Sequence, residues 1–417
     1  MRYVLTICGL LGTVFTVYYI LTCFGGMLRK RKSQAEYEDR IRIAVVVAAR
    51  NEEAVIGDLV RSLKMQRYPS DLYDIYVIPN NCTDGTEQAA RDAGARILRC
   101  TGRVSSKGEV LKQAFMQLTA MNRYDAYCVF DADNLVDPMF FHHVNNARQA
   151  GCHAAQDFRD SKNPFDSWVS GSMSVFYWFM SRFFNESRSR LNLSCHLNGT
   201  GFMVSDALIR DMGWNTGTLT EDLEFTALCA LRGYRIGWMP NARIYDEQPV
   251  RFRDSAVQRR RWTSGSLQCM RRYAKALIER KTAVSLDIGC LFLGNLLNYV
   301  GILSGVATVV ALLNALREGF DLARYVPLLL AYGIGCWALC ALVSAVMFRL
   351  EGKLCARSVP TILGFAFFAL SWAIINVFAS LTRPPRWKTI RHTRSAAMPR
   401  RRPERSQYVQ YTGQGAE

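Results

Sequence analysis

Apolar and polar positions are distributed along the chain on two length scales. Four long stretches are almost wholly apolar, at residues 3–24, 288–316, 325–348 and 359–381. Each reaches the ~20 residues that a helix needs to cross a bilayer. Between the first two stretches, from residue 40 to 280, the apolar runs are short. The pattern predicts a polar domain carried by membrane helices.

The short apolar runs have the length and composition of strands buried on both faces of a parallel sheet. They lie at residues 41–49, 73–79, 96–100 and 125–133, with helical periodicity in between. This succession predicts a doubly wound, mostly parallel α/β sheet, which binds ligands at the carboxyl ends of its strands. Neither G-x-G-x-x-G nor G-x-x-x-x-G-K-[ST] occurs, so a dinucleotide fold and a P-loop are not expected.

Basic residues follow the first apolar stretch directly, at 29–32. A signal peptide has the opposite order, so we expect an uncleaved anchor with its basic end in the cytosol. Three further simple crossings would place the basic tail outside, against the positive-inside rule. Stretch 288–316 is long for one span and contains Asn295 and Asn298. We therefore expect it to lie partly in the interface, with the tail in the cytosol.

Composition narrows the classes of partner. The 417 residues carry a net charge of +17, which suits an anionic membrane surface or phosphate-bearing substrates. Nucleic acid is not expected as a partner, because none of its binding motifs is present. The 13 cysteines are scattered without a C-x-x-C pair and are expected to be reduced thiols.

Polar clusters follow the predicted strands. Asp131 and Asp133 bracket an alanine after the fourth strand. Carboxylates this close require a neutralising partner, and Mg²⁺ or Mn²⁺ completed by substrate phosphates fits, although D-x-D alone also suits a capped surface turn. Lys107 precedes a helix, where it could hold a phosphate or lie on a solvated loop.

Two further motifs lie closer to the apolar region. Thr220-Glu221-Asp222 suits a helix N-terminus, and a carboxylate fixed there could also act as a general base. In "QRRRW", a helix would place Gln258, Arg261 and Trp262 on one face, for diphosphate and sugar-ring contacts. Arg259 and Arg260 would then point elsewhere, toward lipid headgroups. A plain interfacial amphipathic helix is the alternative.

These motifs, in the order D-x-D, T-E-D and Q-x-x-R-W before a membrane region, resemble the processive family 2 glycosyltransferases. That group contains the cellulose, hyaluronan and chitin synthases. The resemblance covers nearly the whole chain, and "AARNEE" at 48–53 is similar to the family's first nucleotide-binding strand end. It implies a GT-A fold and transfer from a UDP-sugar.

The resemblance also implies roles for individual residues. Asp222 would be the catalytic base with Glu221 beside it, and Asp131 and Asp133 would bind the metal. The donor and its diphosphate would be held by Glu52, Asn80, Asp84, Lys107, Asp131, Gln258 and Arg261. The acceptor would be held by Trp262, Asn198, Gly199 and Thr200. Gln156 and Arg159 would flank the donor, and Trp387 resembles a tryptophan that closes over the nucleotide.

One position departs from the family pattern. Asn80 stands where many relatives have an acid that contacts the nucleotide base or ribose. An amide can both donate to and accept from uracil. The replacement of this acid by Asn80 is also compatible with a different nucleotide preference or with an inactive protein.

Together these expectations give five regions. An anchor occupies residues 1–28, a cytosolic GT-A domain 40–245, interfacial helices 246–284, transmembrane or re-entrant helices 285–382 and a basic tail 383–417. The predicted function is inverting, metal-dependent transfer from UDP-glucose or UDP-N-acetylglucosamine to a growing β-linked polysaccharide at the plasma membrane. The alternatives are a single transfer to a glycolipid or polyprenyl-linked acceptor, and an inactive scaffold of an export complex. The sugar, the linkage and the oligomeric state stay open.

Overall fold

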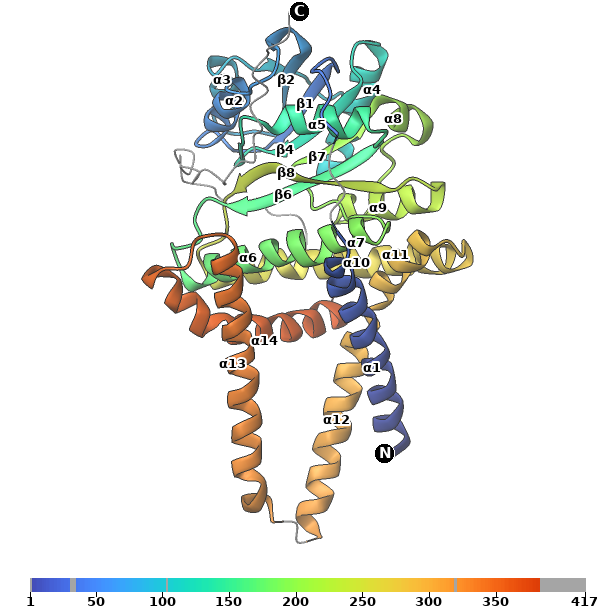
Figure 1. The fold of residues 1–417 in the computed structure, drawn as a ribbon, viewed down its shortest axis with the longest axis vertical. Helices are drawn as coiled ribbons and strands as arrows, with labels where there is room; N and C mark the ends of the chain where they lie inside the picture. Colours follow the sequence, from blue (N-terminus) through green and yellow to red (C-terminus); the bar gives the residue numbers. More distant parts are fainter. Residues whose placement is uncertain (1, 31–34, 103, 319–320, 383–417) are drawn as a thin grey trace, which may run out of the picture.

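The molecule is built in three layers along its long axis (Figure 1). The computed structural model describes residues 2–30, 35–102, 104–318 and 321–382. An α/β domain lies at one end, helices run crosswise beneath it, and further helices continue away from it. The crosswise helices include α6 (Trp168–Phe179), α10 (Phe252–Glu279) and α14 (Val359–Leu381). Those that continue are α1 (Arg2–Phe24), α12 (Leu296–Arg317) and α13 (Val326–Leu350).

One sheet organises the α/β domain. Its strands are β1 (Ile43–Ala49), β2 (Tyr73–Pro79), β3 (Arg96–Ile97), β4 (Ala126–Asp131), β5 (Leu135–Val136), β6 (Ala154–Ser161), β7 (Phe202–Ser205) and β8 (Ile236–Asp246). They are ordered β3-β2-β1-β4-β7-β6-β8-β5. Strands β1 to β4 pair in parallel, β7 is antiparallel to its neighbours β4 and β6, and β6 pairs in parallel with β8. The predicted doubly wound, mostly parallel sheet is confirmed.

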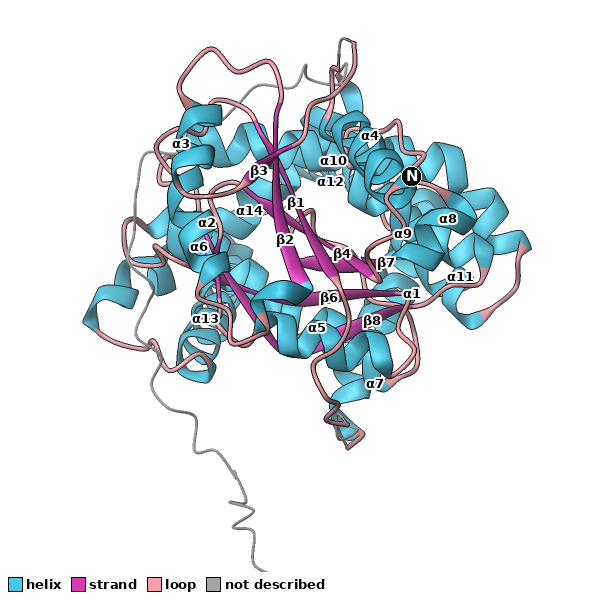
Figure 2. Cartoon of the chain, turned by 90° about the horizontal axis from the view of Figure 1, so that it is seen from above, coloured by secondary structure: helices cyan, strands magenta, loops and turns pink. Residues whose placement is uncertain are grey.

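Helices cover both faces of the sheet (Figure 2). One face packs against α2 (Ile56–Lys64), α3 (Thr86–Asp92) and α5 (Phe140–Gln149), and the other against α4 (Lys107–Ala120), α8 (Asp206–Met212) and α9 (Glu221–Arg232). Because side chains alternate along a strand, Val45 and Val47 of β1 enter the first core while Val46 enters the second. This double burial explains why the first strands are continuous apolar runs.

The strand directions place several acids at one edge. Strands β4, β6 and β8 run the same way, since β7 is antiparallel to both β4 and β6. Strand β4 therefore ends on Asp131 at the same edge at which β8 ends on Asp246. This edge faces the crosswise helices.

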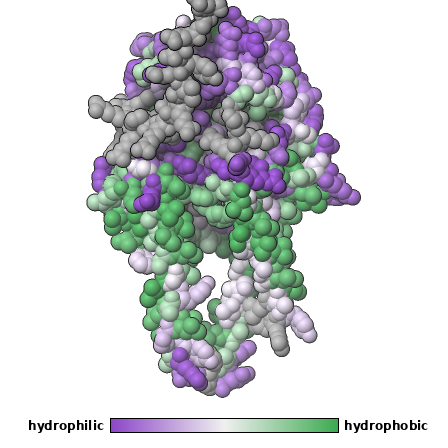
Figure 3. Space-filling model, viewed as in Figure 1, coloured by the Kyte–Doolittle hydropathy of each residue, from purple (hydrophilic) through white to green (hydrophobic). Residues whose placement is uncertain are grey.

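Among the described residues, four helices are long and apolar enough to cross a membrane by length and composition. The predicted stretch 288–316 is divided, because α11 (Ala283–Leu293) ends at Gly294 and α12 begins at Leu296. Helix α11 packs on α10, whereas α12 runs away from the domain (Figure 1). In Figure 3, hydrophobic residues are densest over the crosswise layer and the adjoining parts of the helices beyond it, paler and hydrophilic residues lie at the far ends of these helices, and hydrophilic residues dominate the visible surface of the α/β domain.

Buried ion pairs join the α/β domain to the apolar helices at two places. In the first, Arg188 of α7 (Glu186–Arg190) pairs with Asp287 of α11 at 3.0 Å, and Tyr18 of α1 donates to the same carboxylate at 2.7 Å. In the second, Asp160 of β6 accepts from Lys353, just beyond α13, at 2.5 Å. Removing one partner of a buried pair leaves an uncompensated charge, so these contacts hold the layers in fixed positions.

Candidate active site

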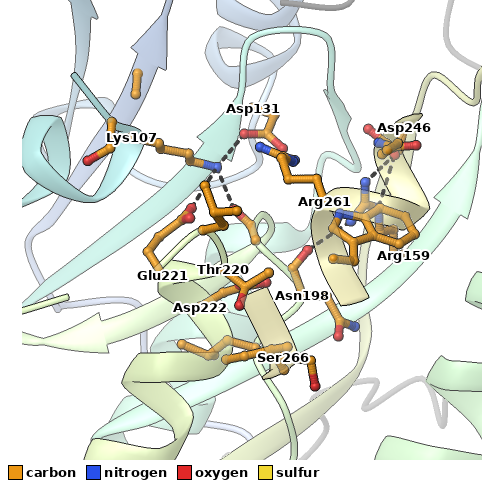
Figure 4. Close-up of a pocket in the computed structure, with 18 of the residues that line it drawn as sticks. Lys107, Asp131, Arg159, Asn198, Thr220, Glu221, Asp222, Asp246, Arg261 and Ser266 are labelled. Atoms are coloured by element: carbon orange, nitrogen blue, oxygen red, sulfur yellow. Dashed lines mark hydrogen bonds and ion pairs between the residues drawn. The ribbon is translucent and has the colours of Figure 1, made fainter. Parts of the chain in front are cut away.

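A cavity of about 450 Å³ begins at the acidic edge of the sheet and extends to the crosswise helices. Strand ends, the segment around Asn198, the start of α9 and one face of α10 form its walls. The predicted residues among its lining are Glu52, Asn80, Lys107, Asp131, Asp133, Asn198, Gly199, Glu221, Asp222, Gln258, Arg261 and Trp262. Residues far apart in sequence thus meet in one place (Figure 4).

Acidic side chains crowd the sheet end of the cavity. Asp131 and Asp133 follow β4, and Asp246 ends β8. Burial raises the pKa of Asp246 to about 6; Arg159 opposes this shift, whereas the charges of Asp133 and Asp131 reinforce it. A divalent cation would relieve this repulsion, and two carboxylates completed by phosphate oxygens suit Mg²⁺ or Mn²⁺. Within the described residues, no group of three or more His, Cys, Asp or Glu forms a metal site by itself.

Lys107 connects three walls of the cavity. It is the first residue of α4, whose N-cap Ser106 accepts a hydrogen bond from the Glu109 amide. Its ammonium pairs with Asp131, donates to the Gly199 carbonyl at 2.7 Å and lies 3.9 Å from Glu221 (Figure 4). Burial lowers the pKa of Lys107, but these carboxylates outweigh it and the net shift is upward. The side chain is therefore a fixed cation inside the cavity.

Asp222 lies in the first turn of α9 and faces the loop at Gly199. A Cβ added to that glycine, which has φ +81°, would lie 3.4 Å from Asp222 Oδ2. Burial and the charge of Glu221 raise the pKa of Asp222 to about 7, against the lowering effects of the Leu223 amide, Lys107 and Arg261. A carboxylate with such a pKa can take up a proton near neutral pH.

The N-terminus of α9 is held to α10 by a different acid. Glu224 accepts hydrogen bonds from the Gly217 and Thr218 amides at 2.6 and 2.7 Å, and from the Tyr273 hydroxyl at 2.5 Å. Thr220 is the N-cap residue, but its side chain makes no capping hydrogen bond and packs against Gly265 instead. The helix-start prediction for T-E-D is confirmed, and the anchoring comes from Glu224.

Helix α10 presents Gln258, Arg261 and Trp262 to the cavity, as the predicted spacing requires. Arg261 has no hydrogen-bond or ion-pair partner in the described part of the chain and lies near Asp131 and Arg159 in Figure 4. The Trp262 ring is stacked on Phe176 at 6.3 Å between centroids. The prediction for Arg259 was wrong: it is fully buried against α14 instead of reaching lipid headgroups.

The fold agrees with that of proteins that the chain resembles. A family described as "Glycosyltransferase like family 2" matches residues 40–265. The chain belongs to this family. It is a glycosyltransferase, and the mannosyltransferase PcManGT from Pyrobaculum calidifontis, solved with GDP-Man and Mn²⁺, shares its GT-A fold. The structural match covers 91% of this chain and 100% of the PcManGT chain, with a TM-score of 0.60 and 17% sequence identity.

Relatives in sequence differ in their products. Beta-monoglucosyldiacylglycerol synthase of Synechocystis sp. is 26% identical over 373 residues, 85% of this chain and 75% of that protein. The Nostoc sp. protein of the same name is matched over 55% of its length. Glucomannan 4-beta-mannosyltransferase 7 of Arabidopsis thaliana is 26% identical over 170 residues, 39% of this chain and 30% of that protein. Processive synthesis is thus not confirmed for this glycosyltransferase.

Three predicted residues of the glycosyltransferase lie within the described part of the chain but outside the cavity lining. Asp84 is exposed, and its carboxylate accepts from the Glu53 and Thr86 amides, both at 3.2 Å. Thr200 is buried, and its hydroxyl accepts from the Asp131 amide at 2.9 Å. Gln156 is buried as well and accepts from the Asn198 amide at 2.8 Å. These residues hold cavity loops in place; Trp387 lies outside the described residues.

Arg159 lines the cavity, as expected for a residue beside the donor, but its partner Asp246 was missed. The guanidinium donates to Asp246 through Nε at 3.0 Å and to the Asn198 carbonyl at 2.8 Å (Figure 4). It also lies 3.9 Å from the Tyr177 ring centroid. The sequence did contain a signal for Asp246. This acid ends a strand-like run directly before "EQP" at 247–249, just as Asp131 ends an earlier strand.

The membrane-facing end of the cavity was also missed. Its lining is uncharged and includes the apolar or aromatic Phe176, Met180 and Trp372 and the polar Thr263, Ser266, Asn295 and Asn376. Trp372 packs on Phe176 at 4.5 Å, and Thr263 donates to Asn376 at 2.6 Å. These residues come from α6, the segment Met180–Asn185 that follows it, α10, α14 and the junction before α12, which no local motif connects.

Proposed function

We propose that this glycosyltransferase moves one sugar from a nucleoside diphosphate sugar to the free hydroxyl of a neutral membrane lipid of the diacylglycerol class. The observation that carries the proposal is the cavity itself. It has an acidic and cationic end at the sheet, a neutral end among the apolar helices, and Asp222 among its lining. A donor and a lipid acceptor can meet there at one base.

The charged side chains divide the work of a single displacement. Asp222 would take the proton from the acceptor hydroxyl as its oxygen attacks the sugar carbon, which inverts that carbon. Lys107 and Arg261 would stabilise the departing diphosphate, and Arg can do so in bidentate fashion. A Mg²⁺ or Mn²⁺ ion between Asp131 and Asp133 would neutralise further charge on this leaving group. The Mn²⁺ of PcManGT supports that assignment.

The base argues for an alcohol acceptor. A lipid phosphate is already ionised and needs no base, and the Asp222 carboxylate would repel it. Moreover, the lining residues at the other end of the cavity, which include Thr263, Ser266, Trp372 and Asn376, carry no charge. Both features favour a neutral lipid with a hydroxyl over a polyprenyl phosphate.

The crosswise helices argue against the export of a polymer. Helix α14 lies beneath α6 and α10, where a channel leading straight from the cavity to the far side of the membrane would have to pass (Figure 1). Trp262, Phe176 and Trp372 contact one another across this floor. The Synechocystis glycolipid synthase, matched over 85% of this chain, supports the same acceptor class.

Extension of a β-linked polysaccharide is the second candidate. It is favoured by Gln258, Arg261 and Trp262, which carry the resemblance to processive synthases, and by the Arabidopsis glucomannan relative. The inactive scaffold is not retained, because the chain is a glycosyltransferase whose acids and cations face one cavity. We take UDP-glucose as the first donor to test, with GDP-mannose as the alternative because Asn80 replaces the usual acid.

Purified protein in vesicles provides the test. Labelled UDP-glucose, UDP-N-acetylglucosamine and GDP-mannose are offered in turn, with Mn²⁺, to vesicles that contain dioleoylglycerol or, as a control, trioleoylglycerol, which has no hydroxyl. We expect lipid-extractable label with only one of the two lipids, dioleoylglycerol, and loss of transfer after chelation of the metal. Label in a lipid-insoluble polymer, or equal transfer in both vesicles, would overturn the proposal.

A further inference from the structure

Helix α14 is composed like a membrane span but is packed like a crosswise helix. Its 23 residues, Val359–Leu381, contain no charged side chain and would extend about 34 Å at 1.5 Å per residue, enough to cross a bilayer. Its contacts nevertheless run along its whole length to α6 and α10. Both of those helices belong to the layer that supports the α/β domain.

The first turns of α14 lie against the start of α6. A Cβ on Gly171 would clash with Thr361, and a Cβ on Gly364 would lie 3.0 Å from the Trp168 ring. These small residues let the two helices approach closely. The beginning of α14 therefore lies in the crosswise layer, next to α6.

The middle of α14 is bound by a buried arginine of α10. Arg259 donates to Ser371 Oγ at 3.0 Å and to the Phe368 carbonyl at 3.4 Å. Its guanidinium carbon lies 4.2 Å from the Phe368 ring centroid and 5.3 Å from that of Trp372. A buried cation needs such hydrogen bonds to offset its desolvation, so this contact strongly favours the docked position.

The last turns of α14 return to the same helix. Thr263 donates to Asn376 at 2.6 Å, and Arg260 donates to Thr382 Oγ1 at 3.1 Å. Both ends of α14 thus lie on the side of the membrane helices that carries the α/β domain. A helix that crossed the bilayer would have one end on the opposite side.

The opposite face of α14 is exposed and apolar. Leu363, Phe367, Leu370, Ile374 and Leu381 follow one another at helical spacing, and each is between 46% and 68% exposed. Such a stripe is costly in water but is stable against acyl chains. Helix α10 contacts α14 through Arg259 and Arg260. Unlike α14, it has no stripe of exposed apolar side chains along its described length.

We infer that α14 lies in the plane of the membrane, with this stripe in the acyl chains of the leaflet next to the α/β domain. The chain then crosses the bilayer at α1, α12 and α13, and Thr382, which follows α14, lies on the side of the α/β domain. The inference does not depend on the proposed acceptor. It also gives the consecutive arginines separate uses: Arg259 and Arg260 hold α14, and Arg261 faces the cavity.

The depth of α14 in a bilayer tests the inference. A fluorescent amino acid is introduced by stop-codon suppression in place of Leu363, Leu370 or Leu381, and the protein is reconstituted in vesicles with lipids brominated near the headgroup or near the chain end. We expect all three positions to be quenched more by the shallow bromine, and to similar extents. A much deeper position 370, flanked by shallow positions 363 and 381, would show a crossing helix and overturn the inference.

Helix α13 supplies the matched control. Leu328, Leu339 and Leu350 mark its start, middle and end and are all exposed. The same labels there should be deepest at position 339. A second readout uses protease-cleavable tags in sealed vesicles: a tag after residue 417 should be cleaved from the same side as the α/β domain, and one at residues 319–320 from the opposite side. If the protease cleaved the tag after residue 417 and the tag at residues 319–320 from the same side of the vesicle membrane, the inference would be contradicted.

Discussion

At the scale of single residues, the position of Asp222 decides what the cavity can do. Its carboxylate faces Gly199, and Lys107 and Arg261 are near enough to lower its pKa against the effect of burial. Glu221 is next in sequence, but it points toward Lys107 at 3.9 Å. The two adjacent acids therefore have different surroundings, and substitutions can distinguish the roles proposed for them.

Asp222→Asn should lower kcat by roughly 100-fold to 10,000-fold, the usual range for losing a general base. Binding of the nucleoside diphosphate should be nearly unchanged, because the amide keeps the shape of the site. Glu221→Gln is the control and should reduce kcat much less. Rates from labelled donor, together with calorimetric nucleotide binding, measure both effects; equal losses in the two variants would contradict the base assignment.

The pH profile should report the same carboxylate. With the pKa of Asp222 near 7, the base is protonated and inactive at lower pH, so kcat/KM should rise up to about pH 7 and level off above it. Because the charge of Glu221 helps to raise this pKa, Glu221→Gln should move the inflection to lower pH. Profiles at subsaturating donor test this, and an inflection unmoved by Glu221→Gln would count against the assignment.

Sequence reasoning found those residues whose motifs are local. Asp131, Asp133, Asp222 and Trp262 stand in short, ordered patterns, and all line the cavity. Asp246 was missed because a single acid after a strand is a common surface feature. Its role depends on Arg159, which is brought to it by the parallel pairing of β6 with β8.

At the scale of elements, the relation between α9 and α10 sets the geometry of the site. Thr220, which precedes the two acids, packs directly on Gly265 of α10, where an added Cβ would lie 2.5 Å from the threonine side chain. A glycine in a helix interior costs roughly 1 kcal/mol relative to alanine. Here it is required for the close approach.

Gly265→Ala should therefore destabilise the protein by about 1–3 kcal/mol, the usual cost of overpacking. It should also reduce kcat, because Asp222 follows the displaced Thr220. Gly305→Ala in α12 is the matched control, since nothing lies within 4 Å of the added Cβ and alanine is the better helix former. Thermal unfolding and transfer rates measure the pair; equal stability of the two variants would contradict the packing argument.

Elements differed in how well the sequence predicted them. The buried strands β1, β2 and β4 were found because double burial leaves continuous apolar runs. The break at Gly294 was indicated by the polar residues around it. The orientation of α14 could not be predicted, because an apolar helix has the same composition whether it crosses the bilayer or lies along α10.

At the scale of the whole molecule, the layers place the acidic end of the cavity above helices that are apolar enough to cross a membrane, so the proposed donor site would lie directly over a lipid phase. The ion pairs of Arg188 with Asp287 and of Lys353 with Asp160 hold the α/β domain at a fixed height above the apolar helices. The acceptor end of the cavity then lies at the level of α14 and the start of α12. An acceptor that resides in the leaflet would reach Asp222 by lateral movement.

This arrangement predicts that each acceptor receives one sugar, because a glycosylated lipid must leave the cavity sideways before the next hydroxyl can enter. The most direct measurement is mass spectrometry of the products formed in dioleoylglycerol vesicles at increasing ratios of UDP-sugar to lipid. A single species, heavier than the lipid by one sugar and absent with Asp222→Asn, is the predicted result. A ladder of species that lengthens as donor is added would contradict the account.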